Sequence, residues 1–301
     1  MASSESTRQS PYRGSCIVIP TKHAKSVAIA PPFQKWLEVS VLEWLVDTDT
    51  LGTFSGETER EGTALDCARH KCVWAIESLG VEYVLASEGR FGPHPLIPFL
   101  ACDQEMLYFI DKNREFHLHM AHLSENTNYM MQAVSSMEEL QTFATAAGFP
   151  SHALILRPNS PENKGVLFKG VYTPHALTEA FKQSLHQSSD GKVWVETDMR
   201  AQMNPSRMMV IGELAEKMAA RLATFCPACD TPGWGRIRAE KGLHCEYCNQ
   251  ETEMIAREIY GCVLCNHTDQ LPRSDGLEMA PQMHCGWCNR QGDHATHGMV
   301  S

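Results

Sequence analysis

Eight of the twelve cysteines occur as four Cys-x-x-Cys pairs in the last quarter of the chain. Two thiolates at this spacing form a knuckle on one edge of a zinc tetrahedron, and a second knuckle supplies the other edge. The candidate ligands are Cys226, Cys229, Cys245, Cys248, Cys262, Cys265, Cys285 and Cys288. We therefore expect two structural zinc sites, each closed by four sulfurs and without a position for substrate.

Disulfides and redox pairs are the alternative interpretations of these cysteines. Disulfides require an oxidising compartment, and residues 1–15 lack the apolar stretch of a signal peptide. Four knuckles in register are also unusual for redox chemistry. We therefore expect a cytoplasmic protein that binds zinc.

An internal repeat bears on which knuckles share a metal. The second knuckle lies in HCEYCN (244–249) and the fourth in HCGWCN (284–289), so the segment resembles two tandem units, 226–249 and 262–289. Sequential pairing follows, with the first and second knuckles on one zinc and the third and fourth on the other. Crossed or nested pairing is the alternative, because spacing alone does not fix connectivity.

The charge of the chain argues against broad nucleic-acid binding. The 301 residues carry a net charge of −10, and the residues from Cys226 onward contain six Lys/Arg against ten Asp/Glu, a net of −4. Binding to phosphate backbones depends on Lys and Arg. No apolar run has the length of a membrane span. A structural or protein-binding role for the zinc segment is the better expectation.

The segment before the cysteines alternates between strand-like and helix-like patterns. This order predicts an α/β domain, a mixed sheet flanked by helices, followed by a small double zinc ribbon. The expected boundaries are a disordered tail over 1–13, the α/β domain over 14–224, the zinc ribbons over 225–291 and a flexible tail over 292–301.

The expected elements follow from periodicity, caps and turn residues. Pro31 and Pro32 argue against a helix between the first two strands. Strands are predicted at 16–20, 38–46, 81–87, 152–158 and 192–198, a hairpin at 105–123, and helices at 63–79, 136–149, 174–188 and 204–222.

Polar residues follow several of these strands, where sites in α/β sheets gather. Three segments and a fourth further on resemble the house-cleaning nucleoside triphosphate pyrophosphatases, the inosine/xanthosine triphosphatase superfamily. They are TKHAK (21–25), TALDCARHK (63–71), ASEG (86–89) and PSRMMVIGELA (205–215). Three features depart from that family: the acidic turn is Ala-Ser-Glu-Gly, the Ser-His-Arg motif lacks its His, and the Gly-Phe-Gly-Tyr-Asp element is absent unless Glu196-Thr197-Asp198 takes its place.

The resemblance implies Mg²⁺-assisted attack of water on an α-phosphorus, with release of pyrophosphate. Asp66 and Glu88 would then bind Mg²⁺, and Glu57 would be a further ligand or base. Substrate, a nucleotide, would contact Thr21, Lys22, Lys25, Lys71, Arg200, Ser206 and Arg207.

A closer resemblance covers nearly the whole chain. The segments TKH-K, LGTF-GE, ASEG-FGPHP, ETDMRA-MNP and the paired knuckles resemble an uncharacterised bacterial domain family of unknown function. That resemblance implies no activity. A non-enzymatic α/β scaffold whose acidic zinc ribbons bind a protein partner is therefore the alternative to a hydrolase.

Overall fold

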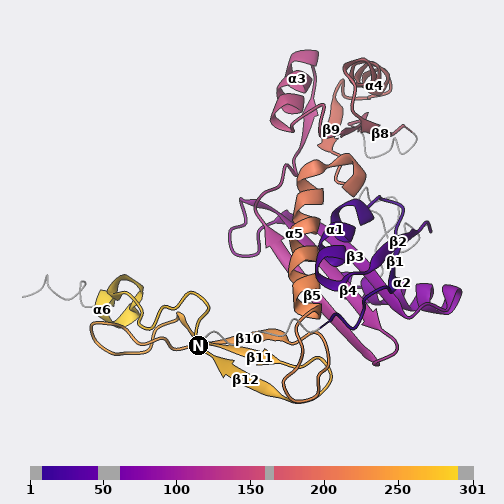
Figure 1. The fold of residues 1–301 in the computed structure, drawn as a ribbon. Coiled ribbons are helices and arrows are strands. Elements are labelled where there is room, and N and C mark those ends of the chain that lie inside the picture. The colour runs from indigo at the N-terminus through magenta and orange to yellow at the C-terminus, as the bar shows by residue number, and fades with distance from the viewer. Residues whose placement is uncertain (1–8, 47–61, 160–165, 291–301) are drawn as a thin grey trace, which may run out of the picture. The chain divides into compact units, whose positions relative to one another are not determined.

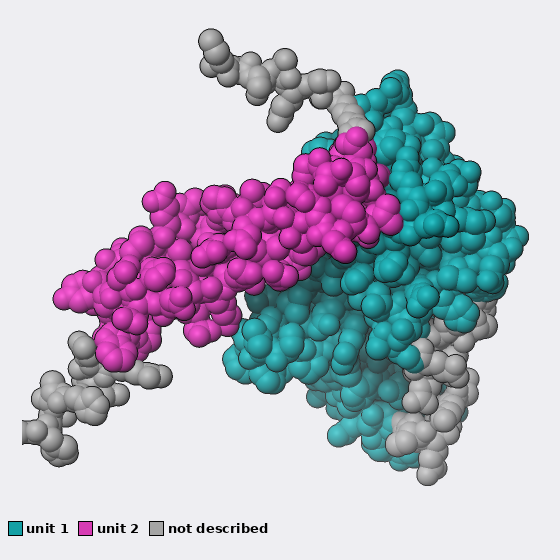
Figure 2. All heavy atoms as spheres, turned by 90° about the horizontal axis from the view of Figure 1, so that it is seen from below, with its two compact units in different colours: residues 1–220 teal, residues 221–301 magenta. Residues whose placement is uncertain are grey.

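The computed structural model describes residues 9–46, 62–159 and 166–290 (Figure 1). The chain divides into two compact units, residues 1–220 and residues 221–301, which are coloured separately in Figure 2. The expected catalytic residue Glu57 lies outside the described residues. So do most of the expected N-terminal tail and all of the expected C-terminal tail. No helix in the described ranges has the length and apolar character needed to cross a membrane.

The first unit contains a mixed sheet, as predicted, and this sheet has five strands. Its spatial order is β2-β1-β3-β4-β5, with β1 parallel to β2 and β3 and the remaining neighbours antiparallel. The strands are β1 (Cys16–Pro20), β2 (Ser40–Trp44), β3 (Tyr83–Pro93), β4 (Ala101–Asp111) and β5 (Phe116–Ser124).

Three helices cover the two faces of this sheet. On one face, α2 (Ala64–Leu79) packs Ala68, Cys72 and Ala75 against a buried cluster that includes Val84 and Ala86. On the opposite face lie α1 (Ser26–Leu37) and α5 (Pro205–Leu222), which contact each other where Gly212 meets the backbone of Ala28. This arrangement confirms a sheet flanked by helices.

The expectation that Pro31 and Pro32 exclude a helix is wrong, since both lie inside α1. Each proline removes one backbone donor, which weakens a helix. Burial of Ile29, Phe33 and Leu37, together with Pro32 itself, places one face of α1 in the core. Apolar burial of a few side chains is worth enough to outweigh the lost hydrogen bonds.

Strand β3 continues to Pro93, although we expected a loop from Glu88 onward. Antiparallel pairing with β4 runs without a break from Tyr83 opposite Asp111 to Pro93 opposite Ala101. The two glycines and the final proline are compatible with pairing because β4 supplies a complete partner ladder. The extension carries Glu88 and Gly89 beyond the last residues of β1.

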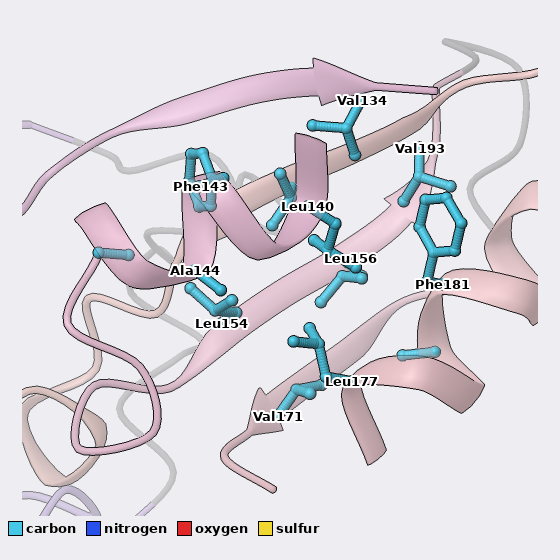
Figure 3. Close-up of a cluster of buried hydrophobic side chains, with 13 residues drawn as sticks. Val134, Leu140, Phe143, Ala144, Leu154, Leu156, Val171, Leu177, Phe181 and Val193 are labelled. Carbon is cyan, nitrogen blue, oxygen red and sulfur yellow. The ribbon is translucent and has the colours of Figure 1, made fainter. Parts of the chain in front are cut away.

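A second, four-stranded sheet follows within the first unit, and its order is β6-β9-β7-β8. Figure 3 shows its core, where α3 and α4 pack side chains such as Leu140 and Phe181 onto Leu154 and Leu156. The sequence did not separate this sheet from the first. Its elements are β6 (Met131–Val134), α3 (Met137–Ala146), β7 (Leu154–Pro158), β8 (Phe168–Val171), α4 (Pro174–His186), β9 (Val193–Thr197) and the 3-10 helix η2 (Ala201–Met203).

Tyr12 belongs to the core, although the sequence placed it in a disordered tail. Its ring is fully buried and makes edge contacts with Tyr83 and Phe109. Its hydroxyl donates a hydrogen bond to Asp111 at 3.2 Å. The ordered first unit therefore includes residues before Gly14.

The second unit is built on a small antiparallel sheet of order β10-β11-β12. Gly235 pairs with Gly261 at one end of the β10–β11 ladder, and Lys241 pairs with Ile255 at the other. Its elements are β10 (Gly235–Lys241), β11 (Ile255–Gly261), β12 (Thr268–Leu271), the 3-10 helix η3 (Gln282–His284) and α6 (Gly286–Arg290).

Candidate functional sites

Two tetracysteine clusters lie in the second unit, and within each cluster all four sulfurs lie within 4.8 Å of one another. A tetrahedral zinc with Zn–S bonds of about 2.3 Å requires sulfurs roughly 3.8 Å apart. The sulfur of Cys226 is 3.8 Å from that of Cys265, and the sulfur of Cys245 is 3.9 Å from that of Cys288. Disulfides would need about 2.05 Å. Both clusters therefore fit structural zinc.

The sequential pairing expected from the repeat is wrong, and the pairing is crossed. One cluster contains Cys226, Cys229, Cys262 and Cys265, and the other contains Cys245, Cys248, Cys285 and Cys288. Strand β10 has seven residues and separates the first knuckle from the second. At about 3.3 Å per residue it keeps them roughly 20 Å apart. The β10–β11 ladder instead brings the first knuckle to the third.

Backbone amides support the thiolates of these knuckles. The amides of Leu264 and Cys265 point at the sulfur of Cys262, at 3.3 and 3.4 Å, and the Cys288 amide points at Cys285 at 3.4 Å. Such donors favour the deprotonated sulfur that zinc requires. If zinc binds, its role here is structural, because four sulfurs leave it no open position.

A second group of chemically capable residues lies in the first unit, at the carboxyl end of β1. Lys25 comes from the turn before α1, and its ammonium donates to the carbonyl oxygen of Ser87 at 2.8 Å and to the Ser87 hydroxyl at 3.1 Å. Burial, and after it the positive charge of Arg207, lower the pKa of Lys25 to about 7. This lysine is therefore poised to change charge near neutral pH.

Arg207 approaches the same place from the first turn of α5. Its Nε donates to Oε1 of Glu105 at 2.6 Å, and both side chains are 1% exposed. Its guanidinium lies 5.0 Å from the ring centre of Phe91 and also donates to the carbonyl oxygen of Met199. The first turn is held by Asn204, whose side chain accepts a hydrogen bond from the Arg207 amide at 3.0 Å and so caps the helix.

Gly89 permits this close approach. A Cβ placed on Gly89 would overlap Nη2 of Arg207 and Oε1 of Glu105. Glycine is therefore needed here for space, since its φ is not in the left-handed region.

Lys71 and Glu88 form a further ion pair on the α2 side, with Nζ and Oε1 2.5 Å apart. The side chains are only 11% and 6% exposed. The charges of Lys71 and Glu88, like those of Arg207 and Glu105, shift the pKa of Lys25. These five charged residues therefore share one electrostatic environment, which we call the buried charge cluster.

Asp103 belongs to the same cluster and was not expected from the sequence. Its side chain is 1% exposed, and burial together with the neighbouring Glu105 raises its pKa to about 8. Asp103 and Glu105 alternate along β4 and so point to one face. The signal in the sequence is the pattern Asp-x-Glu inside a largely apolar strand. The predicted hairpin begins at residue 105, so it includes Glu105 and leaves out Asp103.

The structure brings some of the predicted site residues together and leaves others apart. Lys25 belongs to the buried charge cluster, and Lys71, Glu88 and Arg207 belong to it by their electrostatic influence on Lys25. The buried Thr21 directly follows β1. Lys22 is exposed. Arg200 pairs with the carboxylate of Asp198, with Nη2 and Oδ2 2.5 Å apart, beside the four-stranded sheet.

Asp66 has a structural task at the start of α2. Its Oδ2 accepts from the Thr63 hydroxyl at 2.6 Å and from the Thr63 amide at 3.0 Å, while its own amide donates back to Thr63. This reciprocal capping box lowers the pKa of Asp66. The carboxylate is exposed and occupied by the cap, so the cluster is built without it.

Ser206 contacts a histidine that is distant in the sequence. Its hydroxyl lies 2.9 Å from Nε2 of His152, and Nδ1 of His152 lies 3.0 Å from the hydroxyl of Ser151. An imidazole therefore stands next to the Ser206-Arg207 pair, although no histidine lies between them in the sequence. Periodicity and spacing gave no signal for this contact.

Comparison with curated proteins finds no match to the chain. Nothing in the comparisons links it to the inosine/xanthosine triphosphatase superfamily. The family described as "Domain of unknown function (DUF6671)" matches residues 71–290, more than half of the chain and inclusive of both tetracysteine clusters, and the chain therefore belongs to that family.

Proposed function

We propose that the first unit is a Mg²⁺-dependent hydrolase that acts on phosphoanhydride bonds of nucleoside triphosphates. The observation that carries this proposal is two buried ion pairs, Lys71 with Glu88 and Arg207 with Glu105, whose charges both act on the buried Lys25. Cations of this kind bind phosphate oxygens, and carboxylates bind the metal that bridges them. The cluster also lies at the carboxyl end of β1, where sites in such sheets form.

In the proposed reaction, water attacks the α-phosphorus and the bond from that phosphorus to the bridging oxygen breaks. Pyrophosphate leaves, and the nucleoside monophosphate keeps the new oxygen. Lys25 and Arg207 neutralise charge on the phosphates, and His152 beside Ser206 supplies an imidazole near the start of α5. The resemblance of TKHAK and the Ser206-Arg207 segment to nucleotide pyrophosphatases supports this choice of substrate class.

The test is a screen of common and deaminated nucleoside triphosphates with Mg²⁺, measuring pyrophosphate release. Lys25→Met should lower kcat/KM by about 100-fold or more, because a charged group that stabilises the transition state is lost. Lys35→Met is the matched control, since Lys35 lies on α1, the helix that follows Lys25, and pairs at the surface with Glu216. Absence of turnover on every nucleotide, or equal turnover in both variants, would refute the proposal.

A second candidate function, protein binding through the second unit, is favoured by one observation. Three large side chains around the second tetracysteine cluster are exposed, Tyr247 by 76%, Met283 by 74% and Trp287 by 58%. Tyr247 and Trp287 each sit inside a knuckle. Exposed aromatic and Met side chains are typical anchors of interfaces. The net charge of −4 from Cys226 onward favours a Lys/Arg-rich partner segment.

This candidate is tested with two designed peptides that share leucine anchors, one rich in Lys and Arg and one rich in Asp and Glu. Fluorescence anisotropy should show binding of the basic peptide alone, weakened about tenfold or more by Trp287→Ala. Leu271→Ala, an exposed position on β12, is the control. Binding of both peptides alike, or of neither, would exclude a basic partner.

A further inference from the structure

Asp103 and Glu105 form a pair of carboxylates on one face of the five-stranded sheet. In the β3–β4 ladder, Asp103 lies opposite Phe91 and Glu105 lies opposite Gly89. The guanidinium of Arg207 lies over the ring of Phe91, and a Cβ placed on Gly89 would meet Arg207. The two carboxylates therefore face the first turn of α5. Each acid is 1% exposed.

Three of the four oxygens in this pair accept no hydrogen bond from a donor group among the described residues, and the two carboxyls can bond to each other only through a shared proton. The three are both oxygens of Asp103 and Oε2 of Glu105. Only Oε1 of Glu105 is satisfied, by Arg207 at 2.6 Å. Buried carboxylate oxygens normally have partners, because removal from water without compensation is strongly unfavourable. A bound cation or a shared proton would remove this penalty.

We propose that Asp103 and Glu105 bind one divalent cation, Mg²⁺ or Mn²⁺. Both ligands are hard oxygens, which these ions prefer, whereas the thiolates of the second unit select zinc. Mg²⁺ usually takes only one or two protein carboxylates and completes its octahedron with water and substrate phosphates. The two carboxylates carry the metal site by themselves. Only the identification of the phosphate ligand as a nucleotide rests on the proposed hydrolase function.

The neighbouring cations fit this assignment. The bond from Arg207 occupies Oε1 of Glu105 and leaves Oε2 for the metal. Lys25 bonds to Ser87 and influences the electrostatics of Asp103 from nearby. A metal between the carboxylates would therefore lie beside two cationic groups, an arrangement suited to holding an anionic phosphate in common with them.

The experiment measures Mn²⁺ binding by electron paramagnetic resonance on the full, zinc-loaded chain without nucleotide. The wild type should bind one Mn²⁺, with competition by Mg²⁺, and Asp103→Asn should weaken binding by about tenfold or more. Asp111→Asn is the matched control. Asp111 lies on the same face of β4, is fully buried and is already satisfied by Tyr12 and Arg114.

A second measurement uses the wild type alone, so that a variant that fails to fold does not decide the matter. Mn²⁺ or Mg²⁺ should raise the melting temperature of the first unit, since a ligand of the native state stabilises it. Absence of both binding and stabilisation would show that the pair holds a proton instead. Metal binding without nucleotide turnover would refute the hydrolase and leave the metal site standing.

Discussion

The ammonium of Lys25 donates two hydrogen bonds to Ser87, one to its carbonyl oxygen at 2.8 Å and one to its hydroxyl at 3.1 Å. This contact fixes the turn between β1 and α1 to the part of β3 that extends past β1. Lys25 is held there despite burial that lowers its pKa to about 7. Lys25 therefore gives the buried charge cluster a group whose charge changes near neutral pH.

The first prediction concerns the pH dependence of stability. Between pH 7 and the ordinary lysine value of 10.5, the unfolded chain holds a proton on Lys25 that the folded chain has released. The free energy of unfolding contributed by this residue therefore rises with pH across that window, by at most about 1.4 kcal/mol per pH unit, and is flat below pH 7. Urea unfolding of the first unit, followed by circular dichroism, measures it.

Lys25→Met removes the titrating group, and the difference in stability between wild type and this variant isolates its contribution. Lys35→Met serves as the control, because Lys35 is exposed and pairs with Glu216. A wild-type minus Lys25→Met difference that stays constant from pH 7 to pH 10 would contradict a lowered lysine pKa.

The second prediction concerns space inside the cluster. Gly89→Ala should destabilise the first unit by about 1–3 kcal/mol, because the added methyl group meets Arg207 and Glu105. It should also weaken Mn²⁺ binding, since Glu105 must move. Gly92→Ala is the matched control on the same strand, because a Cβ there meets nothing within 4 Å. Equal melting temperatures for the two variants would show that the cluster is loosely packed.

The third prediction separates capping from catalysis at the start of α2. Thr63→Ala should lower stability by about 1 kcal/mol through loss of the N-cap, while Thr63→Ser should restore most of it. Asp66→Ala should likewise destabilise the helix but leave Mn²⁺ binding unchanged, because its carboxylate accepts from Thr63. Loss of metal affinity in Asp66→Ala would instead support the metal role that the sequence resemblance implied.

Features set by neighbouring residues were predictable from the sequence. Thr63 caps α2 and Gly80 ends it in the left-handed conformation, because both tasks depend on a single turn of chain. The cysteine knuckles are similarly local, since two sulfurs three positions apart share one loop. Such local signals depend little on tertiary packing, and the structure confirms the predicted helix, as α2, and the four knuckles.

Features set by register and packing were not predictable. Asp103 and Glu105 become a buried pair only because β3 extends to Pro93 and pairs along the whole of β4. The helix across Pro31 and Pro32 depends on core contacts made by Phe33 and Leu37. Spacing alone does not reveal which distant surface will cover a residue, so these outcomes required the fold itself.

The last prediction tests the crossed zinc pairing, which follows from the β10–β11 ladder. Loss of one cysteine from each knuckle of a single cluster should remove only that cluster's metal, because two remaining thiolates bind zinc weakly. Cys226→Ser with Cys262→Ser should therefore retain about one zinc per chain. Cys226→Ser with Cys245→Ser leaves three thiolates in each cluster, and both opened sites should lose their zinc to the chelator, so about none should remain. Elemental analysis after dialysis against a mild chelator measures both. Cys102→Ser, a buried cysteine outside the clusters, should retain about two. Sequential pairing gives the reverse order for the two double variants, so the same measurement decides between the two arrangements.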